Sequence, residues 1–219
     1  KNMKNFEYEF ARPSIATDIA LFTIENGSLS IVLIERNEEP LGWALPGGFL
    51  RPDENLMDCA KRETEEETGV NPGHLFHFGN FSEPTRDPRT WVVSVAYFTL
   101  VKRDFITLTA GSDAASARTF NVLELPALAF DHEQIVSEAL LALSEKVRYS
   151  PIALNVMEEV FTLSELQEVY MELGMKEHRT KGNFHRFAKL NLIDPGLIVE
   201  AGGTKSIGRQ RPAKLYKLS

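Results

Sequence analysis

Four glutamates, Glu63, Glu65, Glu66 and Glu67, fall within five positions of the stretch GGFLRPDENLMDCAKRETEEETGV, residues 47–70. On a helix, residues three and four apart are neighbours, so Glu63, Glu66 and Glu67 point from one face into the same volume. Like charges at this spacing repel each other, which predicts a positive partner nearby. Mg2+ and Mn2+ take carboxylate oxygens and complete their shells with water and substrate phosphates. The pattern therefore predicts a Mg2+ or Mn2+ site that bridges to a diphosphate; the alternative is a solvated acidic helix face.

Two glycines and a further acid lie just ahead of these glutamates. Gly47 and Gly48 have no side chains, so their backbone can approach a ligand closely, and Glu54 lies at the mouth of the expected helix. The spacing of the whole segment is Gly48, five residues, Glu54, seven residues, Arg62-Glu63, two residues, Glu66-Glu67, one residue, then Gly69-Val70. This long and specific spacing resembles the Nudix box.

The resemblance implies an α/β/α sandwich that holds a metal ion. The implied metal-binding residues are Gly48, through its carbonyl, Glu63, Glu66 and Glu67. The three glutamates and Arg62 are the implied catalytic residues, with Arg62 holding a glutamate in place and Glu54 nearby. Thr64 departs from the family pattern, which usually has an apolar residue there, so the departure affects packing and not the ligands.

A nucleotide with linked phosphates is the expected ligand, because Nudix proteins characteristically act on nucleoside diphosphates linked to another group. The segment SEPTRDPRT resembles the loop that contacts ADP-ribose in Nudix relatives, and its guanidinium groups suit phosphate and ribose. Surface salt bridges are the alternative for each arginine. The predicted ligand-binding residues are Arg36, Trp43 (by base stacking), Gly47, Gly48, Glu54, Arg86, Asp87, Arg89 and His132. For Asp131-His132 a simple capping aspartate is the alternative, and Glu83 and His132 are distant candidates for a catalytic base.

The elements that must position these residues can be read from turns and periodicity. Two apolar, β-branched runs, residues 17–24 and 29–36, flank Asn26-Gly27 and predict a hairpin. Asp53 or Glu54 is expected to open the acidic helix and Gly69 to end it. Further strands are expected over residues 74–81 and 90–101. Apolar residues recur at helical spacing from Asp131 to about Tyr149, which predicts a helix there.

A second domain is expected after Ser150-Pro151, because proline disfavours helix at the residue before it. The predicted domains are therefore residues 1–150 and 151–219. In the second, Ser164 is expected to cap one helix that ends at Gly174, and Thr180 to cap another. Two alternating runs, residues 196–202 and 213–218, then flank the cationic tip GTKSIGRQRP. Helix, helix and basic hairpin form a winged helix-turn-helix order, so the expected fold class is α+β.

Charge is distributed unevenly along the chain. The net charge is −7, and residues 1–150 contain 14 Lys and Arg against 23 Asp and Glu, whereas residues 174–219 contain 10 against 3. A basic segment on an acidic body is typical of a module that binds a polyanion, although such segments are also often merely solvated. The predicted contacts to double-stranded operator DNA are Thr180, Lys181, Asn183, Arg186, Lys189, Lys205, Arg209, Arg211 and Lys214. A protein-binding winged helix is the alternative.

Composition excludes several other classes of protein. The single cysteine, Cys59, allows neither an internal disulfide nor a cysteine-based zinc site. No apolar run approaches the roughly 20 residues that span a bilayer, and the first residues, KNMKNFEYEF, lack the apolar core of a signal peptide. We therefore expect a cytoplasmic protein with no membrane segment.

Two functions from different classes fit these residues. The segments FTLSELQEVY, GNFHRFAKLNLI and GRQRPAKLY are similar to the C-terminal winged helix of the Nudix-related transcriptional regulators, known for control of NAD metabolism. That resemblance implies a repressor that senses ADP-ribose or a related metabolite and binds operator DNA, as a homodimer. The complete box favours a second hypothesis, a Mg2+-dependent ADP-ribose pyrophosphatase with an accessory C-terminal domain.

Overall fold

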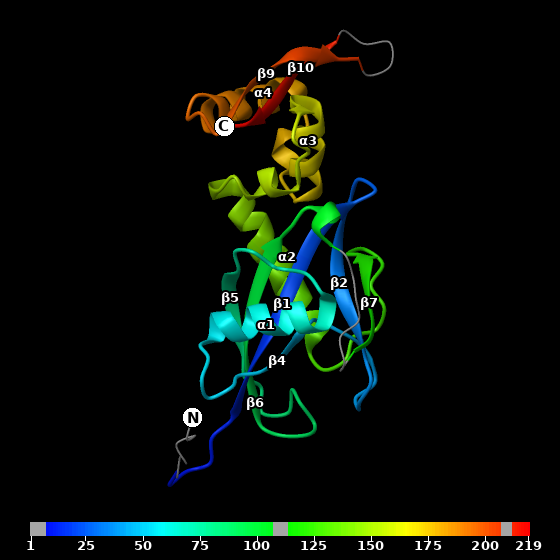
Figure 1. Cartoon of the computed structure of the whole chain (residues 1–219), viewed down its shortest axis with the longest axis vertical. Helices are drawn as coiled ribbons and strands as arrows, with labels where there is room; N and C mark the ends of the chain where they lie inside the picture. Colours follow the sequence, from blue (N-terminus) through cyan, green and yellow to red (C-terminus); the bar gives the residue numbers. More distant parts are fainter. Residues whose placement is uncertain (1–7, 107–113, 207–211) are drawn as a thin grey trace. The chain divides into compact units, whose positions relative to one another are not determined.

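The computed structural model describes residues 8–106, 114–206 and 212–219 (Figure 1). The chain splits into two units, one formed by residues 1–22 and 30–140 and the other by residues 23–29 and 141–219. None of the helices in the described ranges is both long enough and apolar enough to cross a membrane.

The hairpin expected around Asn26 and Gly27 is present. It joins β1 (Ser14–Glu25) to β2 (Ser28–Arg36), which are neighbours in the sheet. Asn26 has a φ of 51° and Gly27 a φ of 78°, and two successive positive φ angles suit the twist of a tight hairpin. The local turn residues were therefore sufficient to predict this element.

A mixed seven-stranded sheet forms the body of the first unit, with the order β3-β2-β1-β6-β5, β4 paired to β1 and β7 paired to β2. β1 and β6 run parallel, whereas β4, β3, β7 and β5 pair antiparallel with their neighbours. The remaining strands are β3 (Gly42–Ala44), β4 (Gly47–Phe49), β5 (Phe76–Phe81), β6 (Val92–Leu100) and β7 (Ala114–Asn121). The sequence predicted β5 and β6, but not the short β3 and β4 or the polar β7.

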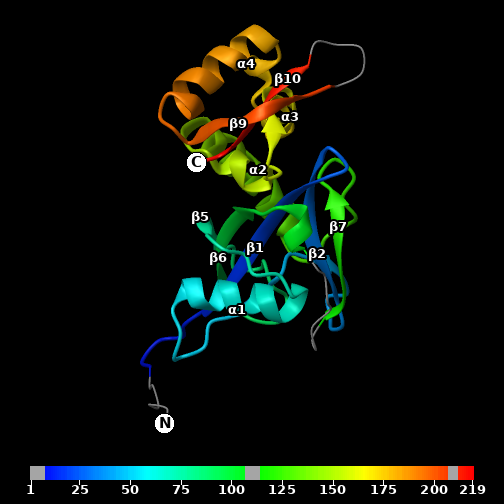
Figure 2. The same ribbon diagram turned by 45° about the horizontal axis from the view of Figure 1, so that its top comes forward.

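Helices lie on both faces of this sheet, as an α/β/α sandwich requires. α1 (Leu56–Thr68) crosses one face, and the first part of α2 (His132–Tyr149) lies behind the other (Figures 1 and 2). A short 3-10 helix, η1 (Arg103–Phe105), follows β6. The core cluster on the α1 side consists of Ile19, Leu21, Val32, Ala60, Val70, Leu75, Tyr97 and Ile106.

The two ends of α1 are fixed by different kinds of cap. Gly69 ends the helix with a φ of 73°, as predicted. At the other end the cap is Asn55, not Asp53 or Glu54, because the Asn55 side-chain oxygen accepts the backbone N–H of Asp58 at 3.0 Å.

After α2, the second unit contains η2 (Ile152–Val156), α3 (Leu163–Glu172), η3 (Lys176–His178) and α4 (Lys181–Ala188). The cap of α3 is Thr162 and not Ser164. The Thr162 hydroxyl accepts the N–H of Glu165 at 3.2 Å, while the Glu165 carboxylate accepts the N–H of Thr162 at 2.8 Å. This reciprocal capping box explains the earlier start of the helix.

A three-stranded sheet completes the winged helix arrangement, in the order β8-β10-β9. It contains β8 (Phe161–Thr162), which the sequence did not predict, and the two expected wing strands β9 (Ile198–Lys205) and β10 (Ala213–Leu218). Thr180 caps α4, as predicted, and the chain then continues into a π-helical turn, η4 (Lys189–Ile193). Tyr170 of α3 and Phe184 of α4 pack together in the core, with ring centroids 5.6 Å apart.

Candidate functional site

The two glycines of β4 bring α1 and β1 into close approach. β4 pairs with β1 so that Gly48 lies opposite Thr17. A Cβ atom on Gly47 would lie 2.1 Å from the Thr17 carbonyl oxygen, and a Cβ atom on Gly48 would lie 2.4 Å from the carboxyl carbon of Glu63. Gly47 therefore cannot carry a side chain unless the backbone of β1 moves, whereas a side chain at Gly48 would displace the carboxylate of Glu63.

Arg62 is a positive partner of the acidic cluster within the protein itself. Its Nε and Nη2 donate to the two carboxylate oxygens of Glu54 at 2.9 and 2.6 Å. Its Nη1 donates to Glu63 at 2.5 Å and to Glu66 at 3.0 Å. The hydrogen bonds from Arg62 lower the pKa of Glu54 to about 2. The predicted role of Arg62, holding a glutamate in place, agrees with these contacts.

Glu63 and Glu67 form a pair of carboxylates on one wall of a cavity. The Glu67 carboxylate accepts the backbone N–H of Gly47 at 2.8 Å. Burial raises the pKa of Glu67 to about 8, and the nearby charges of Glu63 and Asp18 add to this effect. Burial also raises the pKa of Glu63, although Arg62 opposes the rise. Two half-buried carboxylates with raised pKa values form a donor set that suits a hard cation.

Glu66 departs from the predicted cluster. Its side chain is 50% exposed, pairs with Arg51 and Arg62, and does not line the cavity. In the part of the chain that the structure describes, no three His, Cys, Asp or Glu side chains come together as a metal site. Two carboxylates and the adjacent Gly48 backbone are thus in place for a cation, and Glu66 would have to turn to complete the predicted set.

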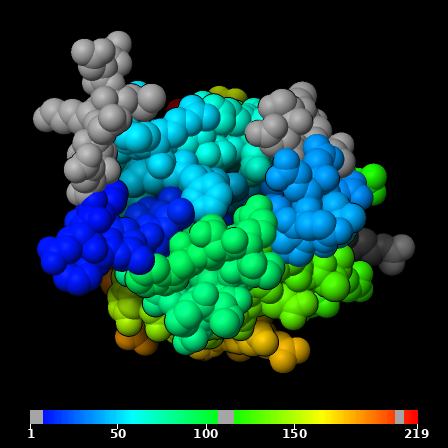
Figure 3. Space-filling view, turned by 90° about the horizontal axis from the view of Figure 1, so that it is seen from below, coloured from blue at the N-terminus to red at the C-terminus, as the bar shows by residue number. Residues whose placement is uncertain are grey.

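The cavity has a volume of about 670 Å³ and is lined by strands, loops and the start of α2. Figure 3 looks onto this end of the molecule, where the blue segment after β2 and the green segment after β5 lie beside each other. The predicted residues that line the cavity are Arg36, Gly47, Gly48, Glu63, Glu67, Arg86, Asp87, Arg89 and His132. The structure therefore brings together residues that are up to 96 positions apart in the sequence.

Trp43 and Glu54 do not line this cavity, although both were predicted to bind the ligand. The Trp43 ring packs edge to face on Phe120 at 4.7 Å, with the Arg118 guanidinium 5.7 Å away. Glu54 is occupied by Arg62. Base stacking by Trp43 has no support in this arrangement, because its ring belongs to the packing between β3 and β7.

Arg86 is anchored within the protein, although its guanidinium was predicted to bind phosphate or ribose. Its side chain is only 5% exposed and donates two hydrogen bonds to Asp131, at 2.9 and 2.7 Å. A third hydrogen bond, of 3.2 Å, reaches Asp18, which also accepts the hydroxyl of Ser94 at 2.5 Å. Sequence reasoning missed Asp18; the available signal was a single acid within an apolar strand.

His132 belongs to the same buried network and has no free ring nitrogen. Its Nδ1 accepts the backbone N–H of Leu45 at 2.9 Å, so Nε2 carries the proton and faces Asp18 at 3.5 Å. Burial lowers the pKa of His132, which favours this neutral form. A role as catalytic base is therefore disfavoured. Asp131 is the residue before α2 and is held by Arg86, so it does more than cap the helix.

The predicted DNA-binding residues on and beside α4 form an exposed surface. Thr180, Lys181, Asn183, Arg186 and Lys189 are all exposed, while Phe184 and Ala188 are buried on the opposite side of the helix. Arg186 and Lys189 make no ion pair or hydrogen bond with any other described side chain. Their charges are therefore available to a polyanion.

The cations of the wing differ from those of α4. Lys205 donates to Glu165 at 2.5 Å, and Lys214 donates to Glu200 at 2.6 Å. Both lysines are thus already paired with an acid. Arg209 and Arg211, the other predicted contacts of the wing, lie outside the described residues.

Comparison with known families agrees with both units. The family model of the NUDIX domain matches residues 14–140. The chain belongs to the Nudix family. The model of the NrtR DNA-binding winged helix domain matches residues 153–218 of this Nudix chain.

Similar proteins share the whole architecture. This Nudix chain is 34% identical over 216 residues to the "ADPR responsive transcriptional repressor NtrR" of Acinetobacter baylyi, a match covering 96% of this chain and 84% of that protein. The crystal structure of Shewanella oneidensis NrtR complexed with a 27mer DNA is 31% identical, with a TM-score of 0.77 over 94% of this chain and 93% of that one. The NUDIX domain of the same NrtR complexed with ADP ribose is 31% identical, with a TM-score of 0.57 over 64% of this chain and 94% of that one. This chain is an NrtR-like regulator with a Nudix domain and a DNA-binding winged helix domain.

Proposed function

We propose that this protein represses transcription by binding operator DNA through residues 151–219 and senses ADP-ribose, or a related nucleoside diphosphate metabolite, through residues 1–150. The bound ligand changes DNA affinity because it binds one arrangement of the protein better than another. Two features support this proposal: the cavity of the first domain and the exposed cations of the second domain.

The observation that carries the proposal is that Arg186 and Lys189 are exposed and unpaired within the described part of the chain. Both side chains are exposed, Arg186 on α4 and Lys189 directly after it, and have no acidic partner among the described residues, so neither stabilises the fold through an ion pair. α4 is the second helix of a winged helix arrangement, the element that enters the major groove in helix-turn-helix proteins. Exposed cations at this helix suit contacts to DNA phosphates.

In the first domain, we propose that Glu63 and Glu67 hold Mg2+ or Mn2+ together with the Gly48 carbonyl, and that Glu66 joins them when it leaves Arg51. Nudix hydrolases generally use divalent metal ions. Bound here, the cation would link these carboxylates to the diphosphate of the ligand. The pair of carboxylates and the absence of a side chain at Gly48 support this assignment.

A DNA-binding titration tests the proposal. Fluorescence anisotropy of the DNA upstream of the protein's own coding region would be measured with and without ADP-ribose, against a scrambled duplex of equal length. We expect sequence-preferring binding that ADP-ribose changes, and loss of binding in the double variant Arg186→Ala, Lys189→Ala. A matched control replaces Lys205 and Lys214, which are already paired, and should bind more tightly than the α4 variant. Equal binding to both duplexes in every condition would refute the proposal.

The second candidate function is hydrolysis of ADP-ribose to AMP and ribose 5-phosphate. It is favoured by one observation, the presence of Glu63 and Glu67 in the cavity. Release of AMP would be measured with and without Mg2+ in the wild type, in Glu67→Gln and in Glu65→Gln, whose exposed side chain lies off the cavity. Turnover that depends on Mg2+, survives in Glu65→Gln and disappears in Glu67→Gln would establish the enzyme. Turnover equal in all three proteins would eliminate it.

We also propose that the protein binds DNA as a homodimer, since helix-turn-helix readers generally recognise palindromes through two-fold symmetry. Light scattering of the purified protein measures its mass directly. A mass near twice 24.6 kDa is expected, and a monomer both free and on DNA would contradict the proposal.

A further inference from the structure

Phe130 is a bulky residue in the left-handed backbone region, directly before α2. Its φ is 58°, and apart from Asn26 it is the only non-glycine residue with positive φ among the described residues. Such a conformation is unfavourable for a side chain with a Cβ atom and persists only where the surroundings impose it. The contacts around Phe130 must therefore hold its backbone in this conformation.

The residues on both sides of Phe130 are fixed by partners elsewhere in the unit. The N–H of Ala129 donates to the Trp43 carbonyl at 2.8 Å. On the other side, Asp131 is held by the two hydrogen bonds from Arg86. His132 follows and accepts the N–H of Leu45. With both flanks anchored, the backbone of Phe130 has no freedom to relax, and its ring is held at the cavity wall.

Two guanidinium groups lie over the Phe130 ring. The Cζ atom of Arg36 is 4.7 Å from the ring centroid, and that of Arg89 is 5.1 Å away. At these distances both cations are attracted by the negative face of the ring. Arg36, Arg89 and Phe130 all line the cavity. The ring therefore determines where the positive charges of the two arginines lie in the cavity.

The two arginines differ in what else they contact. Arg89 donates to both carboxylate oxygens of Asp87, at 3.0 and 2.8 Å, so its charge is already balanced. Arg36 donates only from Nε, to the Pro40 carbonyl at 2.7 Å, and no described carboxylate forms an ion pair with it. Partial burial lowers the pKa of Arg36, and the charge of Arg89 lowers it further. Arg36 is a partly desolvated cation whose two terminal amino groups form no hydrogen bond or ion pair with any described residue.

We infer that Phe130 is a positioning residue that aims the terminal amino groups of Arg36 at a phosphate of the bound nucleotide. The inference rests on the proposed nucleotide-binding function and deepens it, because it adds a contact that needs no metal. Glu63 and Glu67 line the same cavity but reach phosphate only through a cation, whereas Arg36 reaches it directly. The ligand class is therefore an anion that both a guanidinium and a carboxylate-bound cation can hold, such as a diphosphate.

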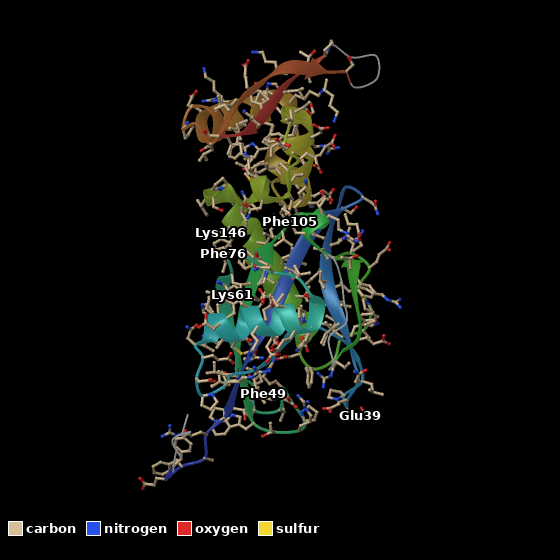
Figure 4. The ribbon with its side chains drawn as sticks, in the orientation of Figure 1. Glu39, Phe49, Lys61, Phe76, Phe105 and Lys146 are labelled. Carbon is tan, nitrogen blue, oxygen red and sulfur yellow. The ribbon has the colours of Figure 1, made fainter. Side chains whose placement is uncertain are left out.

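Substitutions at Phe130 separate this role from packing. Phe130→Leu keeps an apolar side chain but removes the ring, and Phe130→Tyr keeps the ring. Phe130→Gly removes the ring as well and suits a φ of 58°, so it provides a folded variant if the leucine variant fails to fold. Phe105→Leu is the matched control, since Phe105 is exposed and lies at the opposite end of the sheet from the cavity residue Phe49 (Figure 4).

Calorimetric titration with ADP-ribose, in Mg2+ and again in a chelator, measures the effect on binding. We expect Phe130→Leu and Phe130→Gly to weaken binding about tenfold in both conditions, as expected for loss of one partly desolvated cation–π contact. Phe130→Tyr should bind within about twofold of the wild type, and Phe105→Leu should bind like the wild type. Equal affinity of Phe130→Gly and wild type would overturn the inference, as would failure of Phe130→Tyr to restore binding.

A second measurement does not depend on ADP-ribose. The Nε–H signal of Arg36 would be followed by NMR in arginine-labelled protein and assigned through Arg36→Lys. Loss of the ring should shift this signal in Phe130→Leu and not in Phe130→Tyr, and inorganic diphosphate should shift it in the wild type. If the signal does not shift in Phe130→Leu, or does not shift when diphosphate is added to the wild type, the positioning role is refuted, even if ADP-ribose binds. A signal that moves as expected in a protein that ignores ADP-ribose supports the positioning role and refutes only the proposed nucleotide.

Discussion

Arg86 and Asp131 form a two-pronged ion pair that joins the loop before β6 to the start of α2. The hydrogen bonds run from Nε to Oδ2 at 2.9 Å and from Nη2 to Oδ1 at 2.7 Å. Only 5% of the Arg86 side chain and 19% of the Asp131 side chain are exposed. Arg86 also contacts Asp18, so one guanidinium balances two acids beneath the cavity.

Removing Arg86 should therefore destabilise the first unit more than removing its neighbour Arg89. Arg86→Ala leaves the buried Asp18 and the partly buried Asp131 without this cation, and breaking a buried pair typically costs about 3–5 kcal/mol. Arg89→Ala should cost less, about 1–3 kcal/mol, because the Arg89 side chain is 39% exposed and only one acid, the buried Asp87, loses its cation. Urea unfolding followed by tryptophan fluorescence measures the free energy of unfolding of the first unit, since Trp43 and Trp91 both lie in it. Similar losses in the two variants would contradict the structural role of Arg86.

The cap of α3 offers a test in which two neighbouring hydroxyl residues are compared. Thr162→Ala removes the acceptor for the Glu165 N–H and should cost about 1 kcal/mol. Ser164→Ala lies inside the helix and should change the free energy of unfolding by less than about 0.5 kcal/mol. Hydrogen exchange of the first amides of α3 reports on this helix alone. A larger effect at Ser164 would mean that the helix begins two residues later than the structure shows.

Salt dependence distinguishes the cations that contact DNA phosphates from those that are occupied within the protein. Log affinity falls linearly with log salt, with a slope set by the number of phosphates neutralised. Lys189→Ala should lower this slope by about one unit. Lys214→Ala should lower it less, because Glu200 already balances that charge. The slopes would be measured by anisotropy over a range of potassium chloride, and a smaller change at Lys189 than at Lys214 would argue against α4 as the DNA-contacting helix.

Acid should weaken α3 through Glu165. Partial burial raises the pKa of this carboxyl, but its hydrogen bonds with Lys205 and Thr162 outweigh burial and leave the pKa lowered. A lowered pKa in the folded state gives stability that is present above the unfolded value of about 4.3 and is lost as the pH falls through the folded value. Protection of the α3 amides should thus differ between wild type and Glu165→Gln at pH 7, and the two should converge as the pH falls below the lowered pKa of Glu165. A difference that persists undiminished in acid would exclude the carboxylate as its source.

Local sequence signals predicted much of this fold. They failed where a contact with a residue outside the local turn determines the structure. Asn26-Gly27 and Gly69 need only their own backbone angles, so the hairpin and the end of α1 could be read directly. Ser164 and Thr162 are both good caps, and the choice depends on which one the Glu165 carboxylate reaches.

The candidate site shows the same division. The box spacing brought Gly48, Glu63 and Glu67 together correctly, because they lie on one strand and one helix that follow each other in the chain. Arg86 was predicted to bind a ligand, since nothing local distinguishes an arginine that meets a phosphate from one that meets Asp131. Phe130 was not singled out, because its backbone angle is imposed by Trp43, Arg86 and Leu45, all more than 40 positions away.

Gly47 and Gly48 are neighbours, yet the obstacle to a methyl group differs between them. At Gly47 the obstacle is the main chain of β1, which cannot move without disturbing the sheet. At Gly48 it is the end of the Glu63 side chain, which can rotate away. An alanine at position 48 would therefore alter the proposed cation site while the sheet stays intact, whereas an alanine at position 47 would disturb the sheet on which that site is built.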